Sequence, residues 1–191
     1  MARITPLEGR SAPLLLRLFN LASRRFYGQD MTPAKVLAHN PRFLLASLGM
    51  SFFAEGKTRL DPATRLLAMH LVAEMNGCSW CLDFGAAMAQ RRRIGAAKLH
   101  VVGDYATSPL FSPAERAALA YAAEVTQVGA RVADTTFGAL RAHFSEREIV
   151  ELTVAVAAEN FYNRCNAPLE VEAQGFCALP GPITVARRRS A

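Results

Sequence analysis

No apolar run in this 191-residue sequence approaches the roughly 20 residues that a bilayer-spanning helix needs. The longest runs, "PLLLRLF" and "FLLASLGMSFFA", are interrupted by Arg, Ser or Gly. The first residues also lack the apolar stretch and small-residue cleavage site of an export signal. We therefore expect a cytoplasmic protein without a membrane partner.

Sustained alternation of apolar and polar residues, the mark of a half-buried strand, is also missing. The sequence instead has helix-opening residues, such as Asp61-Pro62, and two capping boxes, "SPAE" and "SERE". The prediction is an all-α fold. With no linker or short repeat, we expect one domain over residues 1–168 and a C-terminal tail over 169–191. The expected helices cover 13–27, a short stretch that Thr32 caps, 41–55, 62–75, 81–94, 113–127, a stretch to 144 that Asp134 caps, and 146–163.

A concentrated basic surface is missing as well, although the net charge is +6. The basic residues are dispersed apart from two arginine triplets, at 91–93 and 187–189. The first triplet closes an expected helix, where cations meet the negative end of the helix dipole. The second lies in the tail. We interpret both as solvated charge and expect no nucleic-acid partner.

Cysteine is scarce, yet two of the four cysteines, Cys78 and Cys81, stand three residues apart in "NGCSWCLDFG". A structural zinc site would usually need four ligands, and a second Cys-x-x-Cys or a His-x-x-x-His is absent. A thioredoxin fold would need strands around the pair. In a reducing compartment a permanent disulfide is disfavoured. A redox dithiol and two inert buried thiols both stay open, and we expect no metal or cofactor.

The position of the pair favours the redox interpretation. Asn76-Gly77 is a helix-stop signal, so Cys78 and Cys81 should fall in the first turn of the next helix. Unpaired backbone N–H groups at a helix start stabilise a thiolate and lower its pKa. A separation of three residues on a helix also brings two sulfurs within bonding reach.

Two stretches carry a family resemblance. Residues 60–95, "LDPATRLLAMHLVAEMNGCSWCLDFGAAMAQRRRIG", and residues 144–166, "FSEREIVELTVAVAAENFYNRCN", resemble the core of the AhpD-like alkylhydroperoxidase and carboxymuconolactone decarboxylase superfamily. The likeness extends over roughly residues 35–168. It implies an all-α fold that assembles as homo-trimers or hexamers. It also implies a thiol-dependent peroxidase or disulfide oxidoreductase that acts on hydroperoxides.

The resemblance further implies a role for each cysteine. Cys81 would attack the hydroperoxide and become a sulfenic acid, Cys78 would close the disulfide, and an external dithiol would reduce both. Condensation of a sulfenic acid with a nearby thiol is ordinary cysteine chemistry. The decarboxylase branch typically lacks the pair, so the presence of both cysteines disfavours a lyase. Cys165 and Cys177 have no partner at useful spacing, and we expect them to be bystanders.

The sequence departs from the peroxidases at two positions. Their histidine four residues after the second cysteine is Gly85 here, and their glutamate twelve before the first cysteine is Leu66. Because both groups of the proton relay are absent, we expect weak turnover. The departures also favour the alternative function, a non-catalytic or redox-sensing helical oligomer on the same scaffold.

Other residues could supply the proton transfer or bind substrate. If the helices on either side of Gly77 are collinear, His70 and Glu74 fall on the same helical face as the two cysteines. Glu74, four residues before Cys78, is the candidate catalytic acid or base. His70 and Trp80 are the candidate substrate-binding residues, with core packing as the alternative for each.

Overall fold

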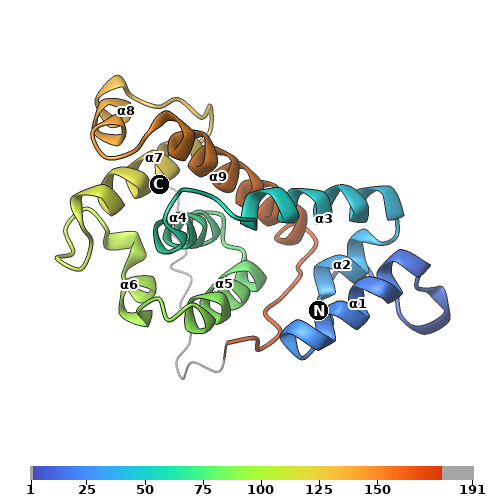
Figure 1. Ribbon diagram of the computed structural model, residues 1–191. Coiled ribbons are helices and arrows are strands. Elements are labelled where there is room, and N and C mark those ends of the chain that lie inside the picture. The colour runs from blue at the N-terminus through green and yellow to red at the C-terminus, as the bar shows by residue number, and fades with distance from the viewer. Residues whose placement is uncertain (1, 178–191) are drawn as a thin grey trace.

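The computed structural model describes residues 2–177, apart from the side chains of Phe53 and Glu55. Over this range the chain forms nine α-helices and no strand, which confirms the all-α prediction (Figure 1). Two short 3₁₀ helices, η1 and η2, accompany them. The bounds are α1 (Leu14–Tyr27), α2 (Thr32–Leu37), α3 (Pro41–Glu55), α4 (Pro62–Met75), α5 (Ser79–Arg91), α6 (Ala96–His100), α7 (Pro113–Thr126), α8 (Asp134–Arg141), α9 (Glu146–Asn166), η1 (Gly9–Ser11) and η2 (Val102–Asp104).

Most helices begin where their capping residues predicted. The Asp61 carboxylate accepts a hydrogen bond from the backbone N–H of Thr64, at 2.8 Å, and starts α4. Both capping boxes are present, at 112–115 for α7 and 145–148 for α9. Each box satisfies N–H groups that the first helical turn leaves without partners.

Three predicted details were wrong. Thr32 is inside α2 and not its cap, because the Gln174 side chain accepts from the Thr32 N–H, at 2.8 Å. Asp134 likewise lies inside α8, whose cap is Ala133. Helix α5 ends at Arg91 and does not continue to 94, since Arg93 has a positive φ of 56°. The separate helix α6 was not predicted.

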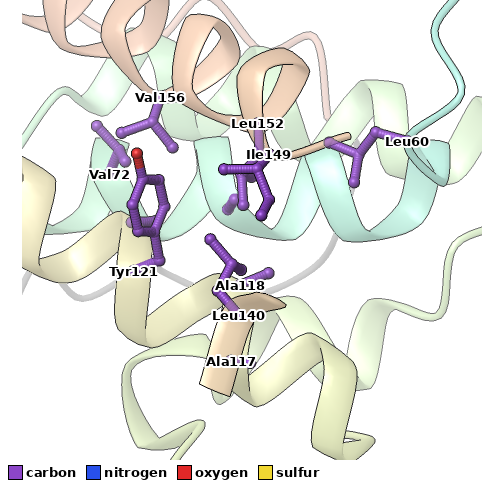
Figure 2. Packing of buried hydrophobic residues seen from close by; sticks show 11 residues of the cluster. Leu60, Val72, Ala117, Ala118, Tyr121, Leu140, Ile149, Leu152 and Val156 are labelled. Atoms are coloured by element: carbon purple, nitrogen blue, oxygen red, sulfur yellow. The ribbon is translucent and has the colours of Figure 1, made fainter. Parts of the chain in front are cut away.

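Helix α4 is the centre of the fold. Nine of its 14 residues are buried, on all sides of the helix, because α5, α7 and α9 pack around it. Figure 2 shows the cluster between α4, α7 and α9, with Val72, Tyr121 and Leu152 among its members. A helix that is buried all round gives the side chains that it carries fixed positions.

The chain reverses between α4 and α5, so these two helices are not collinear. Gly77 has a φ of 66°, in the left-handed region that glycine tolerates, and the Cys78 N–H bonds back to the Ala73 carbonyl. Helix α5 then packs beside α4, and Leu67 and Ala86 belong to one buried cluster. The condition for placing His70 and Glu74 on the face of the cysteines is therefore not met.

The segment that follows α9 returns along α5. In Figure 1 it runs, in orange-red, from the end of α9 towards α5 and α1. It also contacts the first residues of the chain, since the Arg3 N–H donates to the Leu169 carbonyl at 2.8 Å. The division into a 1–168 domain and a 169–191 tail stays a prediction, and residues 178–191, with the arginine triplet at 187–189, lie outside the described residues.

One residue of the arginine triplet at 91–93, Arg91, contacts α1. Arg91 donates to the Phe26 carbonyl and lies over the Tyr27 ring, with 5.1 Å from its guanidinium carbon to the ring centroid. It therefore ties α5 to α1. Between residues 2 and 177, no helix combines the length and apolar character needed to cross a membrane.

Candidate functional site

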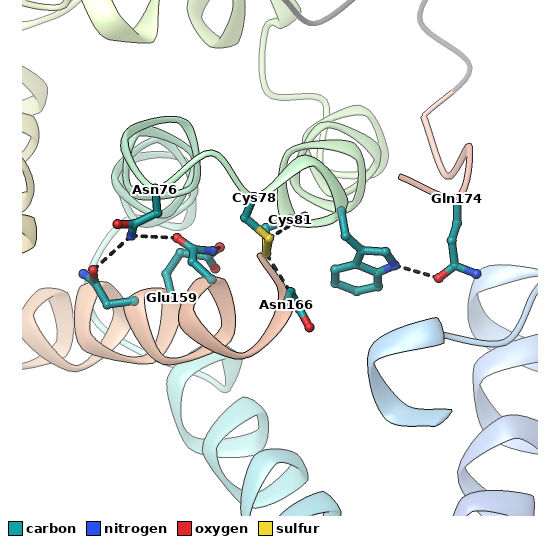
Figure 3. The surroundings of a disulfide bond; sticks show 9 residues. Asn76, Cys78, Cys81, Glu159, Asn166 and Gln174 are labelled. Atoms are coloured by element: carbon teal, nitrogen blue, oxygen red, sulfur yellow. Dashed lines mark hydrogen bonds between the residues drawn. A yellow bond between two sulfur atoms is a disulfide. The ribbon is translucent and has the colours of Figure 1, made fainter. Parts of the chain in front are cut away.

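Cys78 and Cys81 form a disulfide at the start of α5, with their Cα atoms 5.3 Å apart (Figure 3). Cys78 is the N-cap residue, and its sulfur accepts from the Cys81 N–H at 3.3 Å. The predicted position in the first helical turn is confirmed. Both sulfurs lie at the end of α5 where unpaired N–H groups favour negative charge.

The two cysteines differ in their access to a cavity. A cavity of about 190 Å³ lies among α1–α5 and α9, and Cys81 lines it. Cys78 is 1% exposed and, among the described residues, does not belong to the lining. The Cys81 sulfur also accepts from the Asn166 side-chain amide, at 3.6 Å (Figure 3). A molecule in the cavity therefore meets Cys81 and not Cys78.

One wall of the cavity is aromatic. The rings of Trp80 and Phe84 stack with centroids 5.1 Å apart and an interplanar angle of 14°. Phe176 packs edge-on against both. The Trp80 indole N–H donates to the Gln174 side-chain oxygen at 2.6 Å (Figure 3). The remaining walls are mainly apolar, from Phe19, Tyr27, Met31, Leu37, Leu44, Leu48, Leu66, Met69 and Met88.

Several polar side chains interrupt these apolar walls, among them the four of Arg65, Glu159, Tyr162 and His70. Arg65 is 4% exposed and donates to the backbone carbonyls at 54 and 56 and to the Thr58 hydroxyl. Glu159 accepts from the Asn163 amide at 2.6 Å. The Tyr162 hydroxyl shares a 2.7 Å hydrogen bond with that of Ser51. The fourth is His70, which is 6% exposed.

The structure brings three of the four other predicted residues to the cavity. Cys81, Trp80 and His70 line it together, whereas Glu74 does not. Glu74 is exposed, and its Oε1 lies 2.7 Å from the point that a Cβ on Gly103 would occupy. Glu74 therefore lies on the side of α4 that faces η2. The catalytic role of Glu74 stays a prediction that the geometry does not support.

Sequence reasoning missed the acidic residue that does reach the cavity, Glu159. The signal was available, since Glu159 is the one acid in the stretch "TVAVAAENFYN" and lies four residues before Asn163. Asn163 in turn accepts from the Asn76 amide at 3.0 Å, next to the turn that carries the cysteines (Figure 3). This network connects α9 to the disulfide.

Asp83 on α5 binds the backbone of the segment that follows α9. Its buried carboxylate accepts from the backbone N–H groups of residues 174, 176 and 177, at 2.8, 3.0 and 2.8 Å. These three bonds hold the segment after α9, residues 167–177 (the returning segment), against α5. They thereby fix Gln174 and Phe176 behind the aromatic wall.

The described part of the chain contains no group of three His, Cys, Asp or Glu side chains that could hold a metal ion.

The comparisons with known proteins agree with this fold. The model of the carboxymuconolactone decarboxylase family matches residues 41–124. The chain is 33% identical to the uncharacterized protein YnjA of Escherichia coli over 169 residues, which is 88% of this chain and 93% of YnjA. The chain therefore belongs to the carboxymuconolactone decarboxylase family, within the superfamily of AhpD-like proteins.

Two solved structures are similar. A protein of unknown function from Agrobacterium tumefaciens, provisionally described as the antioxidant defence protein AhpD, is 26% identical, with a TM-score of 0.68 over 71% of this chain and 93% of its own. The debrominase Bmp8 is 22% identical, with a TM-score of 0.79 over 91% of this chain and 92% of its own. A cysteine-to-alanine variant of Bmp8 has been solved with 2,3,4-tribromopyrrole.

Proposed function

We propose that this protein is a thiol-dependent peroxidase that reduces organic hydroperoxides with the Cys78–Cys81 pair. The observation that carries the proposal is the unequal access of the two bonded cysteines, since only Cys81 of the pair lines the cavity. An attacking thiol needs contact with the substrate, whereas a resolving thiol needs contact only with the attacking one. The geometry therefore supports Cys81 in the first role and Cys78 in the second.

The cycle has three steps that balance. The Cys81 thiol and the hydroperoxide ROOH give a sulfenic acid on Cys81 and the alcohol ROH, as the O–O bond breaks and an S–O bond forms. The Cys78 thiol then displaces water from the sulfenic acid, and the disulfide forms. An external dithiol finally reduces the disulfide by exchange and leaves as its own disulfide. The cycle requires no metal or cofactor.

The cavity supports an organic substrate. Its mainly apolar walls favour a hydrocarbon body over hydrogen peroxide, because transfer of apolar surface from water is favourable. Trp80 and Phe84 offer flat rings on which such a body can lie. His70, on the neighbouring helix α4, is a polar group that can orient a hydroperoxyl group.

The test starts from fully reduced protein mixed with one equivalent of cumene hydroperoxide. We expect loss of two thiols per chain and a Cys78–Cys81 disulfide in the peptide mass spectrum. A chain whose Cys78 and Cys81 stay reduced in excess hydroperoxide would refute the peroxidase. The alternative, a non-catalytic or redox-sensing oligomer on this scaffold, would then take its place.

One observation favours a second candidate, reductive debromination of a flat aromatic compound. The stacked Trp80–Phe84 pair beside Cys81 suits a planar ring, and the fold matches that of Bmp8. The reaction would convert an aryl bromide and two thiols into the debrominated ring, bromide, a proton and the disulfide. Release of bromide from 2,3,4-tribromopyrrole, compared with oxidation by cumene hydroperoxide under the same conditions, decides between the two.

A further inference from the structure

Gly85 and His70 are in close contact across the α4–α5 interface. A Cβ placed on Gly85 would lie 3.1 Å from His70 Nδ1 and 4.0 Å from its Cε1. A side chain at position 85 would therefore crowd the imidazole where it now lies. Both residues line the same cavity as Cys81.

Position 85 is one helical turn beyond Cys81. Residues four apart on a helix lie on one face, with about 6 Å between their Cβ atoms. The His70 ring thus lies next to the place where a side chain at position 85 would begin, one helical turn from Cys81 along α5 and within the cavity that Cys81 lines. An imidazole that could have come from α5 is supplied by α4.

The nitrogen that contacts Gly85 has no hydrogen-bond partner among the described residues. His70 Nδ1 is buried, and a buried polar atom without a partner costs about 1–3 kcal/mol. A buried polar atom without a partner often marks a functional group, and His70 Nδ1 belongs to a side chain that lines the same cavity as Cys81. A hydroperoxyl group or the thiol of reduced Cys81 would provide the missing partner.

We infer that His70 is the proton-transfer group of this site, which accepts the proton of the Cys81 thiol and passes it to the oxygen that leaves. The inference rests on the proposed function for its oxidant. In the first step the thiol proton moves to the imidazole, the sulfur bonds to the terminal oxygen of ROOH, and the imidazolium protonates RO⁻ to ROH. The ring returns to its neutral form, so it is not consumed.

The charged groups around His70 are compatible with this cycle. Arg65, Arg92 and Glu159 line the same cavity, and His100 acts on the ring from α6. Burial, with a smaller effect of His100, lowers the pKa of His70 to about 4 in the disulfide form. The ring is therefore neutral there, and a thiolate at Cys81 would stabilise the imidazolium once the disulfide is reduced.

The test measures Cys81 without any peroxide. In Cys78→Ser protein, the alkylation of Cys81 by iodoacetamide is followed by peptide mass spectrometry across about pH 5 to 9. His70→Asn in this background should move the midpoint of alkylation upward by about one pH unit, with roughly tenfold slower alkylation at pH 7. Alkylation of Cys165 in the same samples is the internal control and should not change.

Three further variants separate catalysis from folding. His70→Ala removes the imidazole and opens the space beside position 85, so His70→Ala with Gly85→His should restore the alkylation profile from the other helix. Gly85→Ala pushes on His70 and should raise the midpoint, whereas Gly138→Ala, where a Cβ meets nothing within 4 Å, should leave it unchanged.

An unchanged midpoint in His70→Asn, or a failure of Gly85→His to restore it while the double variant melts like the wild type, would overturn the role of His70. Neither outcome bears on whether hydroperoxide forms the Cys78–Cys81 disulfide. That reaction is measured separately in the wild type, so the inference and the proposed function can fail independently.

Discussion

Cys81 lines the cavity, and Cys78, to which it is bonded, is buried behind it. This asymmetry arises from the helix start itself. Cys78 is the cap residue and Cys81 is the third residue of α5, so the two side chains leave the backbone in different directions. Two cysteines that look equivalent in "CSWC" thereby acquire different environments.

The first prediction is that Cys78→Ser and Cys81→Ser block the peroxidase cycle at different steps. Cys78→Ser should accumulate a sulfenic acid on Cys81, because the resolving thiol is gone. Cys81→Ser should lose fast hydroperoxide consumption by at least about a hundredfold, because the thiol in the cavity is gone. Trapping with a 1,3-dione and intact mass spectrometry measure both. Sulfenic acid on Cys78 in the Cys81→Ser variant would contradict the assignment.

The second prediction concerns the other two thiols. Burial raises the pKa of Cys165, which lowers its thiolate fraction although it lines the same cavity as Cys81. Replacement of both Cys165 and Cys177 by Ser should leave the rate of Cys78–Cys81 disulfide formation within about twofold. Thiol counting after hydroperoxide treatment checks this, and disulfides that require Cys165 or Cys177 would refute it.

The third prediction is that Asp83 holds the returning segment in place. Asp83→Ala removes the acceptor of three backbone hydrogen bonds and should lower the free energy of unfolding by about 3 kcal/mol. Trp80, the only tryptophan, should show the change in its fluorescence. Asp134→Ala in the first turn of α8 is the matched control, with a loss below about 1 kcal/mol.

The fourth prediction follows from the pKa of His70, which burial lowers from 6.5 to about 4. The unfolded chain takes up this proton near pH 6.5 and the folded chain only near pH 4. This group therefore has no effect on stability above pH 6.5 and destabilises the fold increasingly as the pH falls towards 4, by about 3 kcal/mol in total.

His70→Asn cannot take up this proton, so it should lose less stability than the wild type between about pH 7 and pH 4.5. Urea unfolding at the two pH values measures the difference. His143→Asn, at an exposed histidine, should follow the wild type. Equal acid losses in His70→Asn and the wild type would mean that the histidine is not held neutral.

The fifth prediction is that the protein is a homo-oligomer, which we propose to be a trimer or hexamer. Large apolar side chains are exposed along one side of α1 and on α3, and such surfaces mark interfaces. They include Leu14, Leu18, Leu21, Phe43 and Phe52. Light scattering should give a mass that is a multiple of 20.8 kDa. Leu21→Glu should weaken the assembly, and a monomeric wild type at micromolar concentration would contradict the prediction.

Local signals predicted much of the fold. Asp61-Pro62 and the two capping boxes act within one helical turn, so the sequence suffices to read them. The position of Cys78 and Cys81 at a helix start follows in the same way from Asn76-Gly77. These interactions join residues that are close in the sequence, so they do not depend on how the helices pack.

The rest of the site depends on how helices pack, which the sequence pattern did not show. Glu74 was placed with the cysteines on the assumption of collinear helices, and the reversal at Gly77 separates them. Gln174 caps α2 at Thr32 from 142 residues away in the chain. The contact of His70 with Gly85 exists only because α4 and α5 lie side by side.

The returning segment that Asp83 holds has a consequence for the order in which the site is built during synthesis. Both cysteines lie within residues 41–124, the part that matches the family model, and they leave the ribosome well before Gln174 and Phe176. The two thiols of a growing chain therefore lack the backing of Gln174 and Phe176 until those residues have emerged. Until then the nascent chain carries an unfinished pocket.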